Sequence, residues 1–281
     1  MSKARTAALT VIAMLAFAGN SLLCRVALRE AHADAASFTA IRLVSGAVAL
    51  WLLLQVRSEP VRVHGSWISA LALFAYAAGF SFAYVSLPAS AGALLLFGAV
   101  QATMIGYGLW RGERLARIQT AGLVLACAGL TGLLLPGLSA PPLGGSLLMI
   151  AAGIAWGVYS LRGRRVTDPT AKTAGNFLRS VAFAVPLSLA LLPGAQCDAY
   201  GAAYAIASGA LASGVGYAIW YSALPGLLAT SAATVQLSVP VIASIGAAIF
   251  LHETITQRLL LASVAVLGGI ALVIFGRKRP R

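Results

Sequence analysis

Charged residues are so widely spaced along this chain that the gaps between them fix its fold class. Three stretches without Asp, Glu, Lys or Arg lie between Arg62 and Arg111, Arg117 and Arg162, and Asp198 and Glu253. Each is long enough for two membrane crossings, because one helix crosses the hydrocarbon core with about 20 residues. Only 10% of the 281 residues are charged, and the mean hydropathy is +0.89. These values exclude a water-soluble domain and predict an all-α integral membrane protein.

Three double gaps and four single crossings together predict ten transmembrane helices. The double gaps divide at Leu87-Pro88, at the prolines and glycines of 136–142, and at Leu224-Pro225, because proline interrupts the helical hydrogen-bond ladder. In chain order we expect helices at 6–28, 35–56, 66–86, 89–110, 117–136, 143–163, 173–193, 201–223, 227–250 and 256–276.

Positive side chains are unevenly distributed over the predicted loops, and this sets the orientation. With the N-terminus inside, the outer segments hold only Arg25, Arg29 and Arg258 of the twenty Lys and Arg residues. Cytoplasmic loops of membrane proteins carry an excess of positive charge. We therefore expect both termini in the cytoplasm of a multi-pass protein of the inner (plasma) membrane. The net charge of +13 is then explained by positive side chains in the cytoplasmic loops. We therefore expect no nucleic-acid partner.

The two halves of the chain resemble one another. A spacing of 137 residues pairs Arg42 with Arg179, Gly79 with Gly216, Tyr84 with Tyr221, and Pro88 with Pro225. Because five helices are an odd number, the second half enters the membrane from the opposite side. Residues 1–139 and 140–281 are thus predicted to be inverted five-helix repeats. Inverted repeats give transporters one state open to each side, with the substrate near the midplane. A duplicated scaffold without a pathway is the alternative.

Motifs at equivalent places of the two halves carry a resemblance to a known family. The first half has Leu87-Pro88-Ala89-Ser90-Ala91-Gly92-Ala93 leading to Gly112-Glu113-Arg114-Leu115, and the second has Leu224-Pro225, Val239-Pro240-Val241 and Leu251-His252-Glu253-Thr254-Ile255. Over its whole length the chain resembles the drug/metabolite transporter superfamily in its EamA-type branch, and within it the aromatic amino acid exporters. The resemblance implies export of phenylalanine, tyrosine, tryptophan and related neutral amino acids, and of some cationic drugs, without a cofactor.

Aromatic and amide side chains deep in the predicted helices are the candidates for substrate binding. They are Phe17, Asn20, Tyr76, Phe80, Gln101, Trp156, Tyr159, Tyr217 and Gln236. A cavity lined by rings with a few amides suits a flat apolar side chain with a zwitterionic head. The alternatives are amides that hydrogen-bond between helices and rings that pack the core. Four other tryptophans, Trp51, Trp67, Trp110 and Trp220, lie near predicted helix ends, where an interfacial belt accounts for them.

Arg42 and Arg179 are the two charges well inside predicted helices. They are placed either to attract a carboxylate at opposite entrances or to bond to helix C-terminal carbonyls. Arg25 and Arg164 are expected to anchor helix ends. Glu113 and Glu253 follow predicted helices in short turns, where we expect them to cap the next helix.

Three prolines are candidate gating elements. Pro88 and Pro225 each free the carbonyl of a tyrosine four residues earlier, so each either hinges a helix end or makes a plain turn. Pro240 frees the carbonyl of Gln236, which could accept a hydrogen bond from a substrate ammonium group. A simple packing kink is the alternative.

The remaining polar residues argue against catalysis. Cys24, Cys127 and Cys197 are far apart, so we expect free thiols and no metal site, and the histidines and acids are scattered over loops. An integral membrane enzyme is therefore the remote alternative. No carboxylate lies in the middle of a predicted span, which favours facilitated export over the proton-coupled export expected of a multidrug cation exporter.

Small residues on the fifth and tenth predicted helices indicate close helix contacts. Gly122, Gly129 and Gly132 lie on the fifth, and Gly268 and Gly269 on the tenth. We expect them to join helices within a monomer, with a homodimer as the alternative. The expected partners are the lipid bilayer and a small-molecule substrate.

Overall fold

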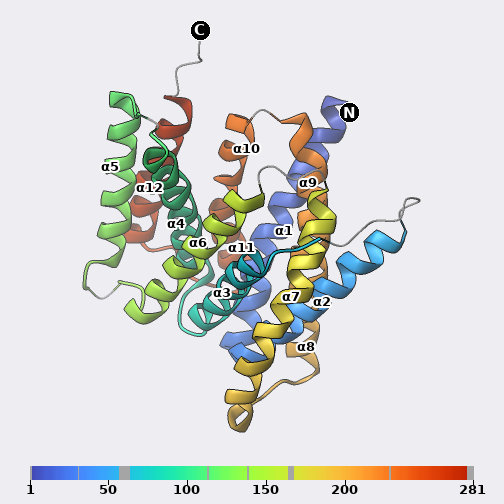
Figure 1. The fold of residues 1–281 in the computed structure, drawn as a ribbon. Helices are drawn as coiled ribbons and strands as arrows, with labels where there is room; N and C mark the ends of the chain where they lie inside the picture. Colours follow the sequence, from blue (N-terminus) through green and yellow to red (C-terminus); the bar gives the residue numbers. More distant parts are fainter. Residues whose placement is uncertain are drawn as a thin grey trace.

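Long helices run between the short loops that proline and charged residues mark (Figure 1). The computed structural model describes residues 2–30, 32–56, 64–112, 114–137, 139–163, 168–227 and 229–276. Its elements are α1 Lys3–Arg29, α2 Ala35–Gln55, α3 Trp67–Tyr84, α4 Ala89–Trp110, α5 Arg117–Leu134, α6 Leu143–Gly163, α7 Pro169–Ala190, η1 Leu192–Gly194, α8 Ala199–Ile206, η2 Ala207–Val215, α9 Gly216–Ala223, η3 Leu224–Gly226, α10 Ala229–Gln236, α11 Ser238–Phe250 and α12 Gln257–Phe275.

The predicted all-α membrane fold is confirmed. Within the described ranges, nine spans are long and apolar enough to cross a membrane, and α8, η2 and α9 together form one of them. The seventh predicted helix corresponds to α7, which has 22 residues but falls outside this set. Its first half carries Lys172, Asn176 and Arg179, which lower its hydropathy. It begins four residues before the predicted start, because Asp168 caps its N-terminus and Pro169 occupies the first turn.

Two predicted helices are not regular along their length. The eighth contains a π-helix, η2, between two α-helical segments. The ninth is interrupted at Leu237, between α10 and α11, where Pro240 lies in the first turn of α11. Proline is tolerated there because the first amides of a helix have no partner within it. The kink expected at Pro240 is therefore a one-residue interruption at Leu237, whose backbone stays in the right-handed helical region, within the single span Ala232–Phe250.

Large apolar side chains cover the outside of the bundle. Trp110 is 80% exposed, Phe250 73% and Leu261 70%, as expected of side chains that face lipid. The start of α1 and the end of α12 lie at the same end of the bundle (Figure 1). We call this end the terminal side and the opposite end the far side.

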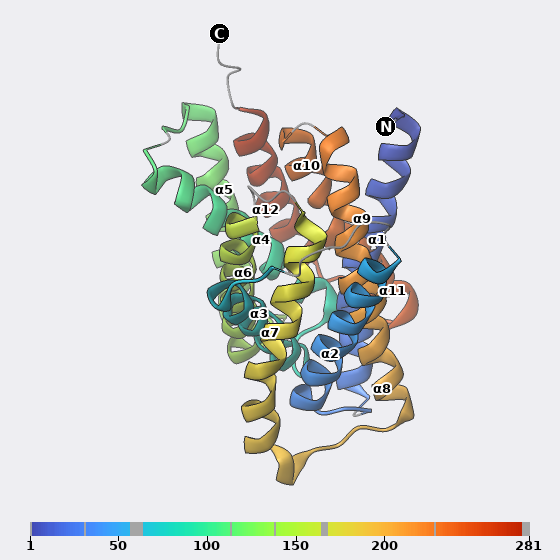
Figure 2. The same ribbon diagram turned by 45° about the vertical axis from the view of Figure 1, so that its right-hand side comes forward.

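Each main contact between helices of the two halves has an equivalent contact in which the roles of the halves are reversed. Figures 1 and 2 show α2 beside α7 and α5 beside α12, each packed against its counterpart. In the same way α3 and α4 pack on α6, while α9 and α11 pack on α1. Gly79 faces Ala152 of α6, and Gly216 faces Ala16 of α1.

Glycines hold α5 and α12 in backbone contact. A Cβ atom on Gly122 would lie 2.5 Å from the carbonyl oxygen of Gly269, and one on Gly269 would overlap the carbonyl of Gly122. Such close approach is typical of membrane helices that pack through small residues. The glycines therefore join helices of one chain, as expected. Gly132 and Gly268 have open space at the Cβ position instead.

We predict that Gly269→Ala destabilises the protein and that Gly268→Ala on the next residue does not. The added methyl group meets backbone atoms of α5 that cannot rotate away, and overpacking of this kind costs about 1–3 kcal/mol. Thermal unfolding of both variants in one detergent measures the difference. Equal melting temperatures would contradict the close contact.

A hydrogen-bonded clip joins two loops on the far side. The backbone amide of Asp34 donates to the carbonyl of Gln196 at 2.7 Å. The backbone amide of Asp198 donates to the carbonyl of His32 at 2.8 Å. The imidazole Nδ1 of His32 lies 2.7 Å from the Asp198 carboxylate. This hydrogen bond raises the pKa of His32 above its ordinary 6.5. Hydrogen bonds from the amide of Gly201 and from His32 lower the pKa of Asp198.

We predict that Asp198→Asn lowers stability only in a window of pH. Asparagine still caps α8, so the variant removes one of the two carboxylates that face His32 and leaves Glu30 in place. The contribution of His32 is complete below its ordinary pKa and is lost as pH rises through the raised value. That of Asp198 is lost as pH falls through its lowered value. Melting temperatures of wild type and variant should differ most between these limits; a constant difference across pH, with Cys197→Ser as the control, would contradict the ion pair.

Candidate functional site

Aromatic rings from the helices α1, α3, α6 and α9 form one continuous cluster in the interior of the bundle. Trp156 of α6 is at its centre, with ring centroids 4.8 Å from Tyr76, 5.0 Å from Tyr217 and 5.3 Å from Tyr159. Trp156 and Tyr159 are stacked, with 25° between their planes. Residues three apart share a helix face, and this brings the two rings together.

Further rings extend the cluster in two directions. On α3, Tyr76 contacts Phe80 and Phe80 contacts Tyr84, at 5.5 and 4.7 Å. Towards α1, Tyr217 contacts Phe17 at 5.7 Å, and Phe17 contacts Trp220. All six aromatic residues singled out from the sequence therefore meet: Phe17, Tyr76, Phe80, Trp156, Tyr159 and Tyr217.

Trp220 was expected in an interfacial belt, and its surroundings differ from that expectation. Its side chain packs on Phe17 inside the bundle, and the residue is only 8% exposed. Trp51, Trp67 and Trp110 are each more than half exposed, as a belt requires. The difference arises because α9 packs against α1 along its length, so the end of α9 is covered.

Buried polar groups meet at the hydroxyl of Tyr76. Asn20 Nδ2 donates to it at 3.3 Å and Arg42 Nη2 at 2.9 Å. The hydroxyl of Ser208 donates to Asn20 Oδ1 at 2.6 Å, which fixes the orientation of the amide. The network joins α1, α2, α3 and η2 at one point beside the aromatic cluster. In a low-dielectric interior such partners are needed, because an unpaired polar group is costly.

Arg42 is completely inside the bundle, at 1% exposure. Its guanidinium carbon lies 4.8 Å from the ring centroid of Phe80 and 5.1 Å from that of Tyr76. Nη2 also donates to Ser213 Oγ at 3.4 Å. The described hydrogen bonds of this side chain thus go to hydroxyls, whereas the sequence favoured helix C-terminal carbonyls.

The π-helix η2 brings two serines to this network. Ser208 and Ser213 are five residues apart, which in an α-helix would place them roughly 140° apart around the axis. In a π-helix, hydrogen bonds join residues i and i+5, so both side chains face the same way. Gly209 lies against the carbonyl of Arg42, where no Cβ atom would fit. The glycine therefore lets η2 approach α2 closely enough for Ser213 to reach Arg42.

Four predicted site residues lie elsewhere. Arg179 donates to the carbonyl of Gly175 in its own helix at 3.0 Å and lies 5.9 Å from the Trp67 ring. The amide of Gln236 donates back to Ala232 at 3.3 Å, and Pro240 is in α11 beyond the interruption at Leu237. Gln101 is buried on α4, and the described hydrogen bonds of the Tyr76 network do not include it.

An ion pair joins α1 to the segment after α11 on the far side of the bundle. Arg25 Nε lies 3.3 Å from Glu253 Oε1, and Arg25 Nη1 donates to the carbonyls of Tyr84 at 2.8 Å and Val85 at 3.2 Å. The Tyr84 carbonyl is the one that Pro88 leaves without its helical donor, as the sequence predicted. We call Arg25, Glu253 and the turn of residues 84–89 the far-side clamp.

Glu253 is a helix cap, but not of the helix that follows it. Both carboxylate oxygens accept from the amide of Ala89, at 2.8 and 3.1 Å, at the first residue of α4. The cap of α12 is Thr256 instead. The prediction failed because the segment after α11 folds against α4, which spacing along the chain does not reveal. Glu113 and Arg164 lie outside the described residues.

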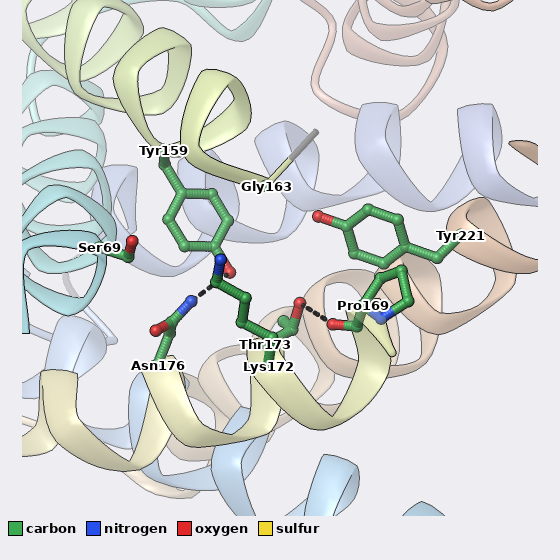
Figure 3. A pocket seen from close by; sticks show the side chains of 8 residues that line it. All are labelled: Ser69, Tyr159, Gly163, Pro169, Lys172, Thr173, Asn176 and Tyr221. Atoms are coloured by element: carbon green, nitrogen blue, oxygen red, sulfur yellow. Dashed lines mark hydrogen bonds between the residues drawn. The ribbon is translucent and has the colours of Figure 1, made fainter. Parts of the chain in front are cut away.

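A pocket on the terminal side leads towards the aromatic cluster. Tyr159 of α6 and Tyr221 of α9 face it together with Asn176, Thr173 and Lys172 of α7 (Figure 3). Asn176 Nδ2 donates to the Tyr159 hydroxyl at 3.4 Å. The ring of Tyr159 stacks on Trp156, so the pocket ends at the cluster. Its volume of about 10 Å³ is the space of about one water molecule, too small for an amino acid.

Sequence reasoning missed Ser208, Ser213, Asn176 and the central position of Arg42. A signal for the serines exists, because Ser-Gly occurs at 208–209 and again at 213–214, a spacing that fits a π-turn. Asn176 lies in the polar first half of α7, close to the expected helix end. No local pattern distinguishes Arg42 from its counterpart Arg179.

Comparisons with known proteins agree with these features. Residues 143–275 match the EamA-like transporter family. An uncharacterized protein of Pseudomonas aeruginosa is 58% identical over 99% of this chain and 97% of its own length. An uncharacterized transporter of Archaeoglobus fulgidus is 25% identical over 95% of this chain and 96% of its own length. A probable amino-acid metabolite efflux pump of Salmonella typhimurium is 27% identical over 68% of this chain and 69% of its own length.

A solved crystal structure shares the fold. It superposes with a TM-score of 0.66 over 97% of this chain and 98% of its own, at 19% sequence identity. The family match and the transporter relatives indicate transport rather than catalysis. The chain is therefore a multi-pass membrane transporter, and its second half, residues 143–275, matches the EamA-like transporter family.

Proposed function

We propose that this transporter exports amino acids with aromatic or other large neutral side chains, across the inner (plasma) membrane. The observation that carries the proposal is the ring cluster around Trp156, which offers stacking surfaces and a hydrogen-bonding network side by side. Flat apolar side chains bind between rings, while a zwitterionic head needs hydrogen-bonding groups. The name of the Salmonella relative, a probable amino-acid metabolite efflux pump, supports the substrate class.

Transport proceeds by alternating access between inverted repeats. The equivalent helix contacts of the two halves support this, since a rocking motion of one half against the other gives one state open to each side. The far-side clamp separates the cluster from the far side, and the Tyr159 pocket approaches the cluster from the terminal side. Pro88 and Pro225 are the corresponding gate elements at opposite ends, and the excess of positive charge in the predicted cytoplasmic segments supports a cytoplasmic terminal side.

Export is facilitated, without proton coupling. The five carboxylates in the described ranges lie at helix ends or in loops, at Glu30, Asp34, Asp168, Asp198 and Glu253. A proton-exchanging carboxylate would need to lie beside the substrate, inside the bundle. The same cluster could bind an organic cation through its ring faces. Arg42 opposes this alternative, because its positive charge already lies over Tyr76 and Phe80.

We predict that Trp156→Ala lowers phenylalanine transport at least about tenfold, while Trp110→Ala leaves it unchanged. The first change removes the ring on which three others pack, and the second removes a ring that is 80% exposed. Counterflow of labelled phenylalanine into liposomes that contain the purified protein measures both. Thermal unfolding of both variants should accompany it, because loss of this partly buried ring also lowers stability.

Two results of this assay would contradict the proposal. If folded Trp156→Ala transports phenylalanine as wild type does, the cluster is not the substrate site. If wild-type counterflow requires a pH gradient, export is proton-coupled and the facilitated mechanism is wrong.

We further predict that Glu253→Gln opens the far side. The change removes the charge that neutralises Arg25, whose side chain is 12% exposed, and weakens the cap of α4. A cysteine placed at Ser90, which is 2% exposed, should react about tenfold faster with an impermeant maleimide added from outside, in a variant whose native cysteines are serines. Glu30→Gln is the matched control, since Glu30 is exposed on the same side. Unchanged labelling would show that the clamp is not a gate.

A further inference from the structure

One nitrogen of the buried Arg42 side chain has no hydrogen-bond partner among the described residues. Nη2 donates to Tyr76 and Ser213, whereas Nη1 is shielded from solvent and donates to none of these residues. The other two side-chain atoms of this kind, on Ser188 and Arg258, belong to half-buried residues. An unpaired buried donor loses its hydrogen bonds to water without replacement, and this cost is greater when the donor is charged. Nη1 of Arg42 can therefore accommodate an acceptor that the described residues do not supply.

The charge of Arg42 is also unmatched by the described carboxylates. Asp34, Asp168 and Asp198 cap α2, α7 and α8. Glu253 pairs with Arg25, and Glu30 lies beside His32. A guanidinium binds a carboxylate best, because its planar fork of N–H groups matches the two oxygens. A carboxylate therefore matches the unpaired part of Arg42 in both charge and geometry.

We propose that Arg42 binds the carboxylate of the transported amino acid, an inference that rests on the proposed function. Nη1 belongs to the planar group that lies over Tyr76 and Phe80, so a carboxylate bound to it lies beside these rings. The Trp156 ring is 4.8 Å from that of Tyr76 and receives the apolar side chain. Asn20 and Ser208 hold Tyr76 in place, which in turn positions the guanidinium. The site selects carboxylates with an apolar body.

Arg179 is the natural control for this role. It is the equivalent of Arg42 in the second half, but it is half-buried and its Nη1 is already paired with the carbonyl of Gly175. The Nη1 atom of Arg42 thus has no described hydrogen-bond partner, whereas the Nη1 atom of its equivalent, Arg179, has one. The proposal assigns the carboxylate to Arg42 alone.

The test compares ligands that differ only in the carboxylate. Phenylalanine and phenylalaninamide compete against labelled phenylalanine in liposome counterflow, with wild type, Arg42→Gln, Arg42→Lys and Arg179→Gln. In wild type and Arg179→Gln the amide should compete at least about tenfold more weakly than the acid. In Arg42→Gln this ratio should fall close to one, and in Arg42→Lys, which keeps the charge but loses the fork, it should fall several-fold.

A second measurement needs no transport. In detergent, 3-phenylpropionate should raise the melting temperature of wild type, and 3-phenylpropanamide should not. The shift should persist in Arg179→Gln and should be lost in folded Arg42→Gln or, if that variant does not fold, reduced in Arg42→Lys. These neutral and anionic partners lack an ammonium group, so they isolate the carboxylate.

The outcomes separate the two proposals. Liposomes with the wild-type protein could transport no amino acid while 3-phenylpropionate still stabilises the protein through Arg42. In that case the proposed substrate class fails and the carboxylate site stands. If wild type transports phenylalanine but does not distinguish acid from amide, the carboxylate site is wrong and the export function stands. A ratio that folded Arg42→Gln or Arg42→Lys shares with wild type also overturns the inference.

Discussion

The absence of water inside a membrane bundle is the constraint on which the rest of this structure depends. A polar group in hydrocarbon must find its partner within the protein, and a charge must find more than one. Arg42 is the severest case in the described part of the chain, because it is fully buried with one nitrogen unpaired. The Tyr76 hydroxyl, Asn20 and the two η2 serines form the polar network around it. The rings of Phe80 and Trp156 then surround that network with apolar surface.

The irregular helix η2 contributes to the polar network around Arg42. The π-helix η2 turns Ser208 and Ser213 to one face, and Gly209 lets its backbone approach α2. A regular α-helix would satisfy the backbone equally well but would direct one serine away from Arg42. Wide turns of this kind occur often at functional sites. The local geometry of η2 is therefore explained by what it holds, since nothing in its own composition demands a π-turn.

Much of the fold was predictable because the hydrocarbon core of a membrane admits few kinds of backbone structure. Charge-free gaps, prolines and the positive loops place the helices, and the spacing of Trp156 and Tyr159 places two rings together. The failures share one cause. Arg42 and Arg179 look alike in the sequence, and Glu253 looks like a cap for α12, because only packing between distant helices sets their partners. The interruption at Leu237 likewise depends on how much of a proline kink the neighbouring helices accommodate.

The carboxylate of Glu253 contacts two different elements, and this couples them. It balances the charge of Arg25 and accepts from the first amide of α4. In the proposed alternating access, displacement of this one side chain would uncap α4 and leave Arg25 without its counter-ion at the same time. The far side and the start of α4 are in this way linked through a single carboxylate.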